Sequence, residues 1–434
     1  MKQFYKVVAN TLVANVTSNF MWFALVFWAY LETNSVLVTG ILGGIFMLMI
    51  AVISIPFGTM VDKQHKKAVM VWTTAVSAAT FGLAALVYLI LLSGRPLDWL
   101  SPSFWIFSVL ILIGAVIMAM RNIVLSTVVT ILVPDDKHAN ANGMVGTVQG
   151  IGFLVTAVFS GLAVGYLGMG WVLAITVVLT ALALIHMITV AIPEKKIVHD
   201  PELAKKKVDI KGSLVAIHSI PGLMGLIIFT TFNNFIGGVY MALLDPYGLS
   251  LLSVQMWGIL TGVGSIGIIL GGLFIAAKGL GKKPLRTLLV VNIIIGVIGG
   301  LIGVRESWVI LGLGMFAYML FIPVIEATEQ TVIQKVVPLK QQGRVFGFAA
   351  AFESMAAPIT SFLIAPLAQF VIIPFMNSDD GRTSLGWLLG EGEARGIALV
   401  FVVAGIVMII AAALAFATKS YHQLSQVFTA KAKS

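Results

Sequence analysis

The feature that most constrains this sequence is a long apolar run that carries two acidic residues. Residues 308–338 read WVILGLGMFAYMLFIPVIEATEQTVIQKVVP, which is long enough to cross a lipid bilayer as a helix. Glu326 and Glu329 lie three positions apart in this run, so their side chains project from one face of the helix. Carboxylates are costly inside a membrane and occur there mainly where they serve a function. The run therefore predicts a membrane protein with a functional site inside the span.

A second apolar run, earlier in the chain, contains a lone cation. Residues 104–134 include Arg121 as their one charged residue. When the two runs are aligned by the proline that ends each, Arg121 falls one residue out of register with Glu326, and segments 139–143 and 343–347 also match. We interpret this as an internal repeat, with a cation in one half and acids in the other. The alternative is a structural salt bridge between two helices, which would leave one carboxylate without a cationic partner.

The composition excludes a soluble globular protein. Of the 434 residues, 59% are hydrophobic and 10% are charged, whereas a soluble domain has about 25% charged residues. The apolar sequence is sufficient for about twelve membrane-spanning helices. The first apolar run, about residues 7–31, is longer than the core of a signal peptide, and no small-residue cleavage site follows it. The chain has no cysteine, which excludes disulfides and thiolate metal sites.

The net charge of +9 does not indicate nucleic-acid binding, because the basic residues lie in short loops between apolar runs. This distribution follows the positive-inside rule, and an even number of spans places both termini in the cytosol. The longest charged run, residues 193–213, mixes both signs and lacks interleaved aromatic residues. It therefore favours a solvated linker, partly an interfacial helix, over a nucleic-acid-binding segment.

Polar residues form a stripe on the first predicted helix. The stripe consists of Thr11, Asn15, Ser18, Asn19 and Trp22. A polar stripe in a membrane helix faces protein or a water-filled cavity. Contact with a solute and hydrogen bonding between helices both account for such a stripe. The repeat places a similar pattern, TTFNNF, at residues 230–235.

The segment GTMVDKQHKK, residues 58–67, resembles the loop motif G-x-L-A-D-R-x-G-R-K between helices 2 and 3 of the major facilitator superfamily. The matching residues are Gly58, Asp62, Lys63, Lys66 and Lys67. In that family the loop stabilises one conformation by pairing with helix ends across the two halves, so the resemblance implies a conformational-switch loop here. The alternative is a solvated loop whose lysines follow the positive-inside rule. GLGKKP, residues 279–284, stands where the second copy of the loop is expected and lacks the aspartate.

The resemblance implies an all-α membrane protein with twelve transmembrane helices in two pseudo-symmetric six-helix bundles. We expect these bundles to be residues 1–192 and 217–434, joined by a cytosolic linker over residues 193–216. In the family, helices 1, 4, 7 and 10 line a central cavity with alternating access. The residues expected to line a substrate cavity are Asn15, Ser18, Asn19, Trp22, Asn233, Asn234 and Tyr318.

Residues 24–40 and 387–401 resemble the branch of this superfamily that contains macrolide-efflux proteins and related drug or siderophore exporters. The resemblance implies proton-coupled efflux of hydrophobic or cationic drugs across a bacterial cytoplasmic membrane. The expected partners are a small-molecule substrate, protons and the lipid bilayer. We expect a monomer that binds no nucleic acid, metal or cofactor.

Proton coupling is expected to depend on Glu326, Glu329, Arg121 and Glu353. A carboxyl group that is removed from water beside a second carboxyl group can load and release a proton at physiological pH. A nearby Arg121 favours the charged form, so a movement that separates them changes the proton affinity. Glu353 is accounted for equally well by a pairing with a neighbouring helix.

Two alternatives to drug efflux remain. The first is transport of another solute on the same scaffold: a siderophore, a lysophospholipid, a peptide or a metabolite. The second is a non-transporting membrane receptor, against which the repeat and its intramembrane charges argue. An enzyme is not expected, because the sequence has no nucleophile–base pair and no nucleotide loop. Residues 262–267 satisfy G-x-G-x-x-G, but no strand precedes them, and we interpret them as helix packing.

Overall fold

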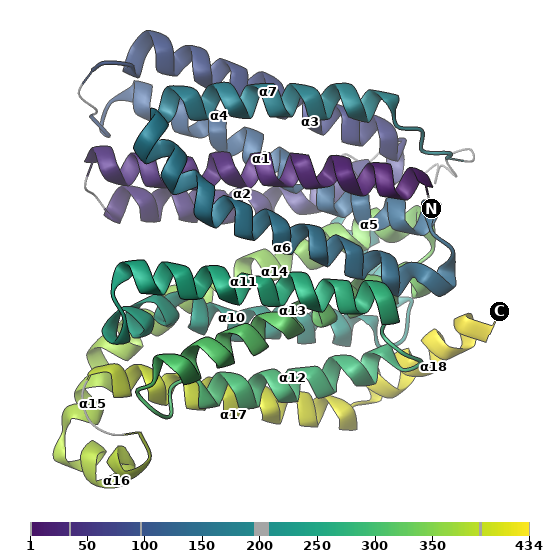
Figure 1. Cartoon of the computed structure of the whole chain (residues 1–434). Helices are drawn as coiled ribbons and strands as arrows, with labels where there is room; N and C mark the ends of the chain where they lie inside the picture. The colour runs from purple at the N-terminus through teal and green to yellow at the C-terminus, as the bar shows by residue number, and fades with distance from the viewer. Residues whose placement is uncertain (1, 34–35, 96–97, 195–207, 390–392, 434) are drawn as a thin grey trace. The chain divides into compact units, whose positions relative to one another are not determined.

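The computed structural model describes residues 2–33, 36–95, 98–194, 208–389 and 393–433, which are almost entirely helical and contain no strand (Figure 1). Within these ranges, eleven helical stretches are long and apolar enough to cross a membrane. One stretch, Asp135–Thr189, has 55 residues, more than twice the roughly 20 that a span needs. Gly168 interrupts it with a φ of +77°, a backbone conformation that favours glycine. Two spans therefore lie in this stretch, in agreement with the predicted twelve-helix fold.

The chain groups into two compact units. Unit 1 comprises Met1–His138, Val148–Ser213 and Pro338–Ala351. Its principal helices are α1 (Lys2–Thr33), α2 (Val36–Lys63), α3 (Lys66–Val87), α4 (Pro102–Ala119), α5 (Arg121–Leu132), most of α6 (His138–Leu162) and α7 (Gly168–Thr189). Residues from α1, α2, α3, α4 and α7 build its apolar core. The Trp28 ring lies in this core with its centroid 5.1 Å from that of Phe107.

Unit 2 comprises Ala139–Thr147, Leu214–Val337 and Phe352–Ser434. Its principal helices are α10 (Leu223–Leu251), α11 (Val254–Lys278), α12 (Pro284–Leu301), α13 (Trp308–Val336), α17 (Glu393–Ala417) and α18 (Lys419–Lys433). Tyr240 of α10 stacks on Phe401 of α17 in its core. Gly267 and Gly271 of α11 lie against the carbonyl oxygens of Phe316 and Leu320 in α13. These glycines therefore serve close helix packing, which the sequence predicts for Gly267.

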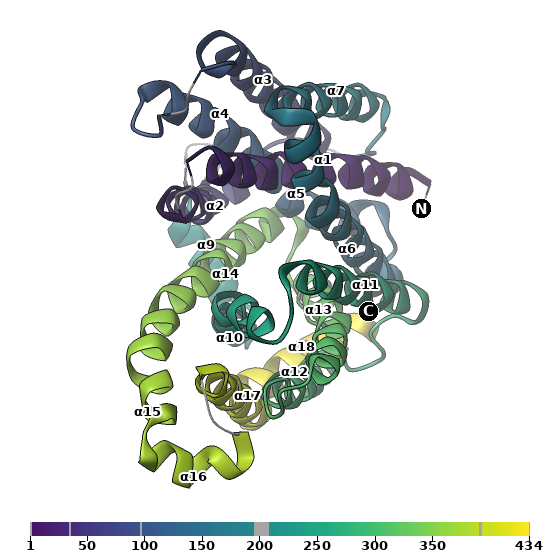
Figure 2. The same cartoon turned by 60° about the vertical axis from the view of Figure 1, so that its left-hand side comes forward.

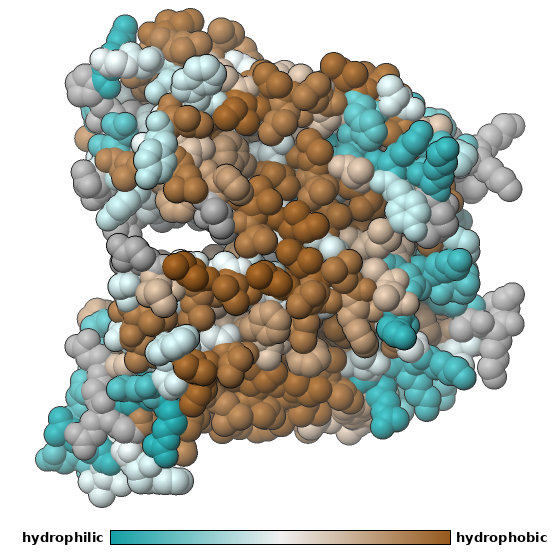
Figure 3. Space-filling view, viewed as in Figure 1, coloured by the Kyte–Doolittle hydropathy of each residue, from teal (hydrophilic) through white to brown (hydrophobic). Residues whose placement is uncertain are grey.

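Side chains in unit 2 separate by polarity along the helices. In Figure 3, brown apolar side chains cover the length of the spans, and teal polar side chains gather at the two ends, one of which is the end where α18 lies. Beyond Ala351, α14 (Leu339–Leu367) continues through η4 (Ala368–Ile372) and α15 (Ile373–Asn377) to α16 (Asp379–Leu389) along one side of the unit (Figure 2).

Each unit includes a short segment from the other half of the sequence, and these are the segments that the repeat matches. Ala139–Thr147 belongs to unit 2, where Gly143 lies against Ile275 and Ala276 of α11. Pro338–Ala351 belongs to unit 1, where Gly347 lies against Ser54 of α2. A side chain at either glycine would collide with its neighbours. The division at residues 193–216 stays a prediction, and residues 195–207 of that linker lie outside the described ranges.

Several helix boundaries differ from those predicted. The single helix expected over residues 104–134 is divided at Met120 into α4 and α5, so that Arg121 begins α5. The sequence also predicts no helix for α16 or α18. Both are short and have too few apolar residues to be recognised as spans, although α18 is amphipathic.

Candidate functional site

The acids predicted on α13 have different surroundings. Glu329 is 9% exposed and accepts a hydrogen bond from the Thr230 hydroxyl of α10, with an oxygen–oxygen distance of 3.3 Å. Its carboxyl group also lies in hydrogen-bonding reach of the carboxyl group of Glu353 on α14. Glu326, on the preceding turn of α13, is exposed. The structure therefore brings Glu329 and Glu353 together, with Glu326 next to them on α13.

A hydrogen bond between two carboxyl groups requires a proton on one of them, because ionised carboxylates have only acceptors. The Thr230 hydroxyl has a single hydrogen, which it can also donate to the Ile227 carbonyl at 3.1 Å. In the part of the chain that the structure describes, neither Glu329 nor Glu353 has a cationic neighbour. A hydrogen bond between Glu329 and Glu353 would therefore place one proton between the two carboxyl groups.

Arg121 is completely buried in unit 1 and has neutral partners there. Its guanidinium donates to Oδ1 of Asn10 and to Oγ1 of Thr74, each at 2.7 Å. Asn10 in turn donates to the Ala183 carbonyl at 2.7 Å and lies 3.2 Å from Nδ1 of His186. Arg121 therefore ties α5 to α1 and α3, and through Asn10 to α7.

Among the predicted cavity residues of α1, some side chains contact neighbouring helices and one is exposed. Nδ2 of Asn15 donates to Oδ1 of Asn122 at 3.4 Å, and the Ser18 hydroxyl donates to the Ala115 carbonyl at 3.3 Å. Trp22 stacks on Phe46 at a centroid distance of 4.3 Å. Asn15 and Ser18 therefore form hydrogen bonds between helices, which is the second of the two roles that such a stripe can have, whereas Trp22 packs against α2. Asn19, by contrast, is exposed.

The predicted cavity residues of unit 2 also differ in their exposure. Asn234, the repeat equivalent of Asn19, is also exposed, and its Nδ2 donates to the Thr230 carbonyl on its own helix at 3.0 Å. Asn233 is half-buried. Tyr318 is half-buried as well, and its ring centroid lies 5.3 Å from that of Tyr240.

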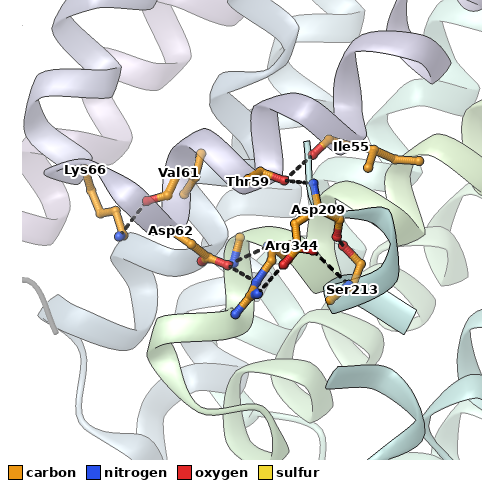
Figure 4. A network of polar contacts seen from close by, with 10 residues as sticks. Ile55, Thr59, Val61, Asp62, Lys66, Asp209, Ser213 and Arg344 are labelled. Carbon is orange, nitrogen blue, oxygen red and sulfur yellow. Dashed lines mark hydrogen bonds and ion pairs between the residues drawn. The ribbon is translucent and has the colours of Figure 1, made fainter. Parts of the chain in front are cut away.

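The predicted switch loop takes part in a polar network centred on Arg344 of α14 (Figure 4). Asp62, at the end of α2, accepts the backbone N–H of Gly343 at 2.7 Å and that of Arg344 at 3.0 Å. Nε of Arg344 donates to the same carboxylate at 3.2 Å. Gly58 lies one turn earlier, and a side chain there would collide with the Gly343 carbonyl. The glycine is thus required for α2 and α14 to approach so closely.

A second aspartate completes this network. Nη1 of Arg344 donates to Oδ2 of Asp209 at 2.7 Å, and both residues are buried. Asp209 precedes α9 (Ile210–His218) and caps it, because its Oδ1 accepts the backbone N–H of Gly212 at 3.0 Å. One guanidinium therefore joins the end of α2, the start of α9 and the start of α14, all in unit 1.

Two lysines of the loop bind backbone carbonyls. Nζ of Lys66, a buried residue, donates to the Val61 carbonyl at 2.7 Å, and Nζ of Lys67 donates to the Ile188 carbonyl at 2.8 Å. The Lys67 backbone N–H also donates to Oε1 of Glu194 at 3.1 Å. These contacts hold the ends of α2 and α7, so the loop is more than a solvated, positively charged connection.

Sequence reasoning missed Arg344, Asp209 and Thr230 as site residues. Asp209 carries a recognisable signal, because an aspartate before a helix with Gly212 and Ser213 downstream is a typical helix cap. Arg344 lies in the repeat-matched segment 343–347, but nothing local in the sequence indicates its two acidic partners.

Known transport proteins resemble this chain in sequence. The model of the Major Facilitator Superfamily matches residues 8–361. Macrolide efflux protein A of Streptococcus pyogenes is 22% identical over 384 residues, which cover 85% of this chain and 89% of that protein. Macrolide efflux protein A of Enterococcus faecalis is 21% identical over 326 residues, which cover 71% of this chain and 94% of that protein.

Solved structures of transporters resemble this chain along almost its whole length. A bacterial homologue of the iron transporter ferroportin, in an outward-facing state, matches with a TM-score of 0.71 and 13% identity, covering 96% of this chain and 100% of that one. The human organic anion transporter MFSD10 (TETRAN) matches with a TM-score of 0.68 and 15% identity, covering 94% of this chain and 99% of that one. At such identities the likeness shows the fold alone.

Proposed function

This chain belongs to the Major Facilitator Superfamily, and we propose that within it the chain exports hydrophobic or cationic drugs in exchange for protons. The family makes it a multi-pass membrane transporter and not an enzyme. Its similarity to macrolide efflux proteins supports efflux and a macrolide-like substrate. The observation that carries the proton coupling is the close pair of carboxyl groups of Glu329 and Glu353 beside Thr230.

The exchange of a drug for a proton follows from the charge of the Glu329 and Glu353 carboxyl groups. With one shared proton, Glu329 and Glu353 carry a single negative charge; without it they carry two, which repel each other in apolar surroundings. A cationic drug that approaches exposed Glu326 supplies a positive charge next to the pair and so replaces the proton. When the drug leaves, the two carboxylates must bind a proton again to reduce their mutual repulsion. Drug and proton therefore compete for the same acids, which is the requirement for antiport.

Alternating access needs a structural element with two states, and the Arg344 network is suited to this role. Two buried aspartates, Asp62 and Asp209, hold one guanidinium at the start of α14. Breaking these ion pairs would separate buried charges of opposite sign, which is unfavourable unless the partners reach water together. We assign the network to the conformation in which the start of α14 is held on α2.

The remaining charges fit the same proposal. Arg121 is part of it as a fixed positive charge whose neutral partners also cross-link α1, α3 and α5. The exposed asparagines Asn19 and Asn234 are proposed to contact the substrate. By the positive-inside rule, the lysine-rich end that carries α18 faces the cytosol, together with both termini.

Transport in proteoliposomes with an imposed pH gradient tests the proposal. The wild-type protein is expected to accumulate a labelled macrolide or a cationic dye against its gradient. Glu329→Gln combined with Glu353→Gln is expected to abolish this accumulation, whereas Glu32→Gln, at the exposed end of α1, leaves it unchanged. Continued accumulation by the double variant, driven by the pH gradient, would show that the pair does not couple transport to protons.

Expression in a drug-sensitive host separates drug efflux from the alternative solutes. Export of drugs is expected to raise resistance to several hydrophobic or cationic compounds, including macrolides. A disruption strain that loses only the uptake or handling of one siderophore, peptide, lysophospholipid or metabolite would favour that solute instead.

A further inference from the structure

An apolar slot runs between the helices of unit 2 near the end that carries α18. The slot is a cavity of about 400 Å³. Phe229 and Phe232 of α10, Leu289 of α12 and Leu414 of α17 are among the side chains that line it, and almost all the other lining residues are apolar as well. Most of its lining residues lie in candidate membrane spans, so the slot suits a hydrocarbon chain more than water.

A polar pocket of about 650 Å³ adjoins this slot. Lys282 and Lys283 line it from just before α12, Arg286 lines it from the first turn of α12, and His422 lines it from α18. These four side chains are exposed, and they are all the Lys, Arg, His, Asp and Glu side chains among the described residues of the lining. The pocket is therefore a concentration of positive charge at the end of a span.

The slot and the pocket adjoin at Leu285 and Tyr421, which line both, and we treat them together as one recess. The recess is apolar along the spans and basic where the spans end. α18 is held against this region: Leu424 is 1% exposed, and Gly222, with a φ of +84°, lies against Ser420 and Leu424. Nζ of Lys431 donates to the Val336 carbonyl at 2.8 Å. These contacts hold α18, which forms one wall of the recess, in place.

We propose that this recess binds one anionic phospholipid, with an acyl chain in the slot and the phosphate among Lys282, Lys283 and Arg286. A soluble anion would leave the apolar slot unfilled, and a cationic drug would be repelled by the three basic side chains. A zwitterionic lipid would neutralise less of this positive charge than a lipid with a net negative headgroup. The site shares no residue with Thr230, Glu329 and Glu353, so it does not depend on the transported substrate.

Native mass spectrometry of the full chain, purified in detergent, tests this site with phosphatidylglycerol and phosphatidylcholine of identical acyl chains. The wild-type protein is expected to retain phosphatidylglycerol preferentially. The combined variant Lys282→Gln, Lys283→Gln and Arg286→Gln is expected to lose this preference, by on the order of 100-fold in affinity for the anionic lipid. Lys137→Gln, Lys278→Gln and Lys340→Gln together remove the same charge from exposed positions outside the recess and are expected to keep the preference.

A second variant tests the slot separately from the basic residues. Ala411→Trp fills part of the slot and is expected to weaken binding of both lipids, whereas the triple variant weakens only the anionic one. Thermal unfolding of the wild-type protein gives a measurement that needs no variant: phosphatidylglycerol is expected to raise the melting temperature more than phosphatidylcholine does.

Three outcomes would overturn the proposal. The first is equal retention of the two lipids by the wild-type protein. The second is an equal loss of preference in the recess variant and in the matched control, which would indicate a general surface-charge effect. The third is competition by water-soluble glycerophosphoglycerol that is as strong as competition by the intact lipid, which would identify a site for soluble phosphate compounds.

Discussion

Nε of Arg344 lies 3.2 Å from the carboxylate of Asp62, although 282 residues separate the two in the chain. The same guanidinium holds Asp209 at 2.7 Å. Because all three side chains are buried, the effect of removing the shared cation differs from that of removing either acid. We expect Arg344→Ala to lower the free energy of unfolding by about 3–5 kcal/mol, since it removes the cation that two buried carboxylates share.

Thermal or denaturant unfolding in detergent, together with transport, measures this effect. Asp62→Asn and Asp209→Asn are expected to cost less each, because Arg344 keeps one acidic partner. A double-mutant cycle between Asp62 and Asp209 should give a coupling energy of about 0.5–3 kcal/mol, since both share one guanidinium. Strictly additive effects would show that the three residues do not act as one network.

Gly58→Ala tests the close approach of α2 and α14. The new methyl group would collide with the Gly343 carbonyl, so we expect weaker contacts of Asp62 with α14 and lower stability. Gly82→Ala is the matched control, because nothing lies within 4 Å of a side-chain carbon at that position of α3. The control is expected to be neutral or to stabilise the helix by up to about 1 kcal/mol. Equal melting temperatures for the two variants would count against the tight contact.

Cross-linking tests whether the start of α14 must leave its contacts during transport. The Thr130 hydroxyl donates to Oε1 of Gln342 at 2.9 Å, and the chain contains no cysteine that would compete for reagents. We expect Thr130→Cys combined with Gln342→Cys, joined by a short bifunctional reagent, to stop transport, and each single variant with the reagent to remain active. Full transport by the cross-linked protein would exclude the proposed switch.

Arg121→Lys separates the charge of Arg121 from its geometry. A lysine keeps the positive charge but cannot reach both Asn10 and Thr74 in the planar arrangement of the guanidinium. We expect a loss of about 1–3 kcal/mol of stability from the unsatisfied buried partner, with the pH-gradient dependence of transport preserved. Arg121→Gln removes the charge as well, and we expect that dependence to weaken. If the two variants transport identically, the charge of Arg121 has no part in proton coupling and the residue serves packing alone.

The spans could be predicted from the sequence because apolar runs of this length are uncommon outside membrane helices. The apolar run predicts one helix over residues 308–338, and α13 covers Trp308–Val336. The length of apolar runs does not predict the amphipathic α18, because its apolar residues are interspersed in the sequence with many polar ones. The break at Met120 also has no signal in the sequence, since neither proline nor glycine is present there.

Partners of individual side chains were harder to predict, because they depend on contacts between residues far apart in the chain. The spacing of Glu326 and Glu329 showed that they share a helix face, but not that Glu353 on α14 would lie beside Glu329. Likewise, the loop motif indicated Asp62, whereas the structure was needed to identify Asp209 as the second partner of Arg344. Charged residues inside an apolar span thus indicate a candidate functional site, whereas the packing of the helices determines which charged side chains contact one another.

The release of protons on substrate binding tests the central claim most directly. Substrate is added to the detergent-solubilised protein in weakly buffered solution, and the change in pH is recorded with an indicator. The wild-type protein is expected to release close to one proton per bound cationic substrate, and the variant with Glu329→Gln and Glu353→Gln to bind without releasing any. Equal proton release by the wild-type protein and this variant would contradict the account.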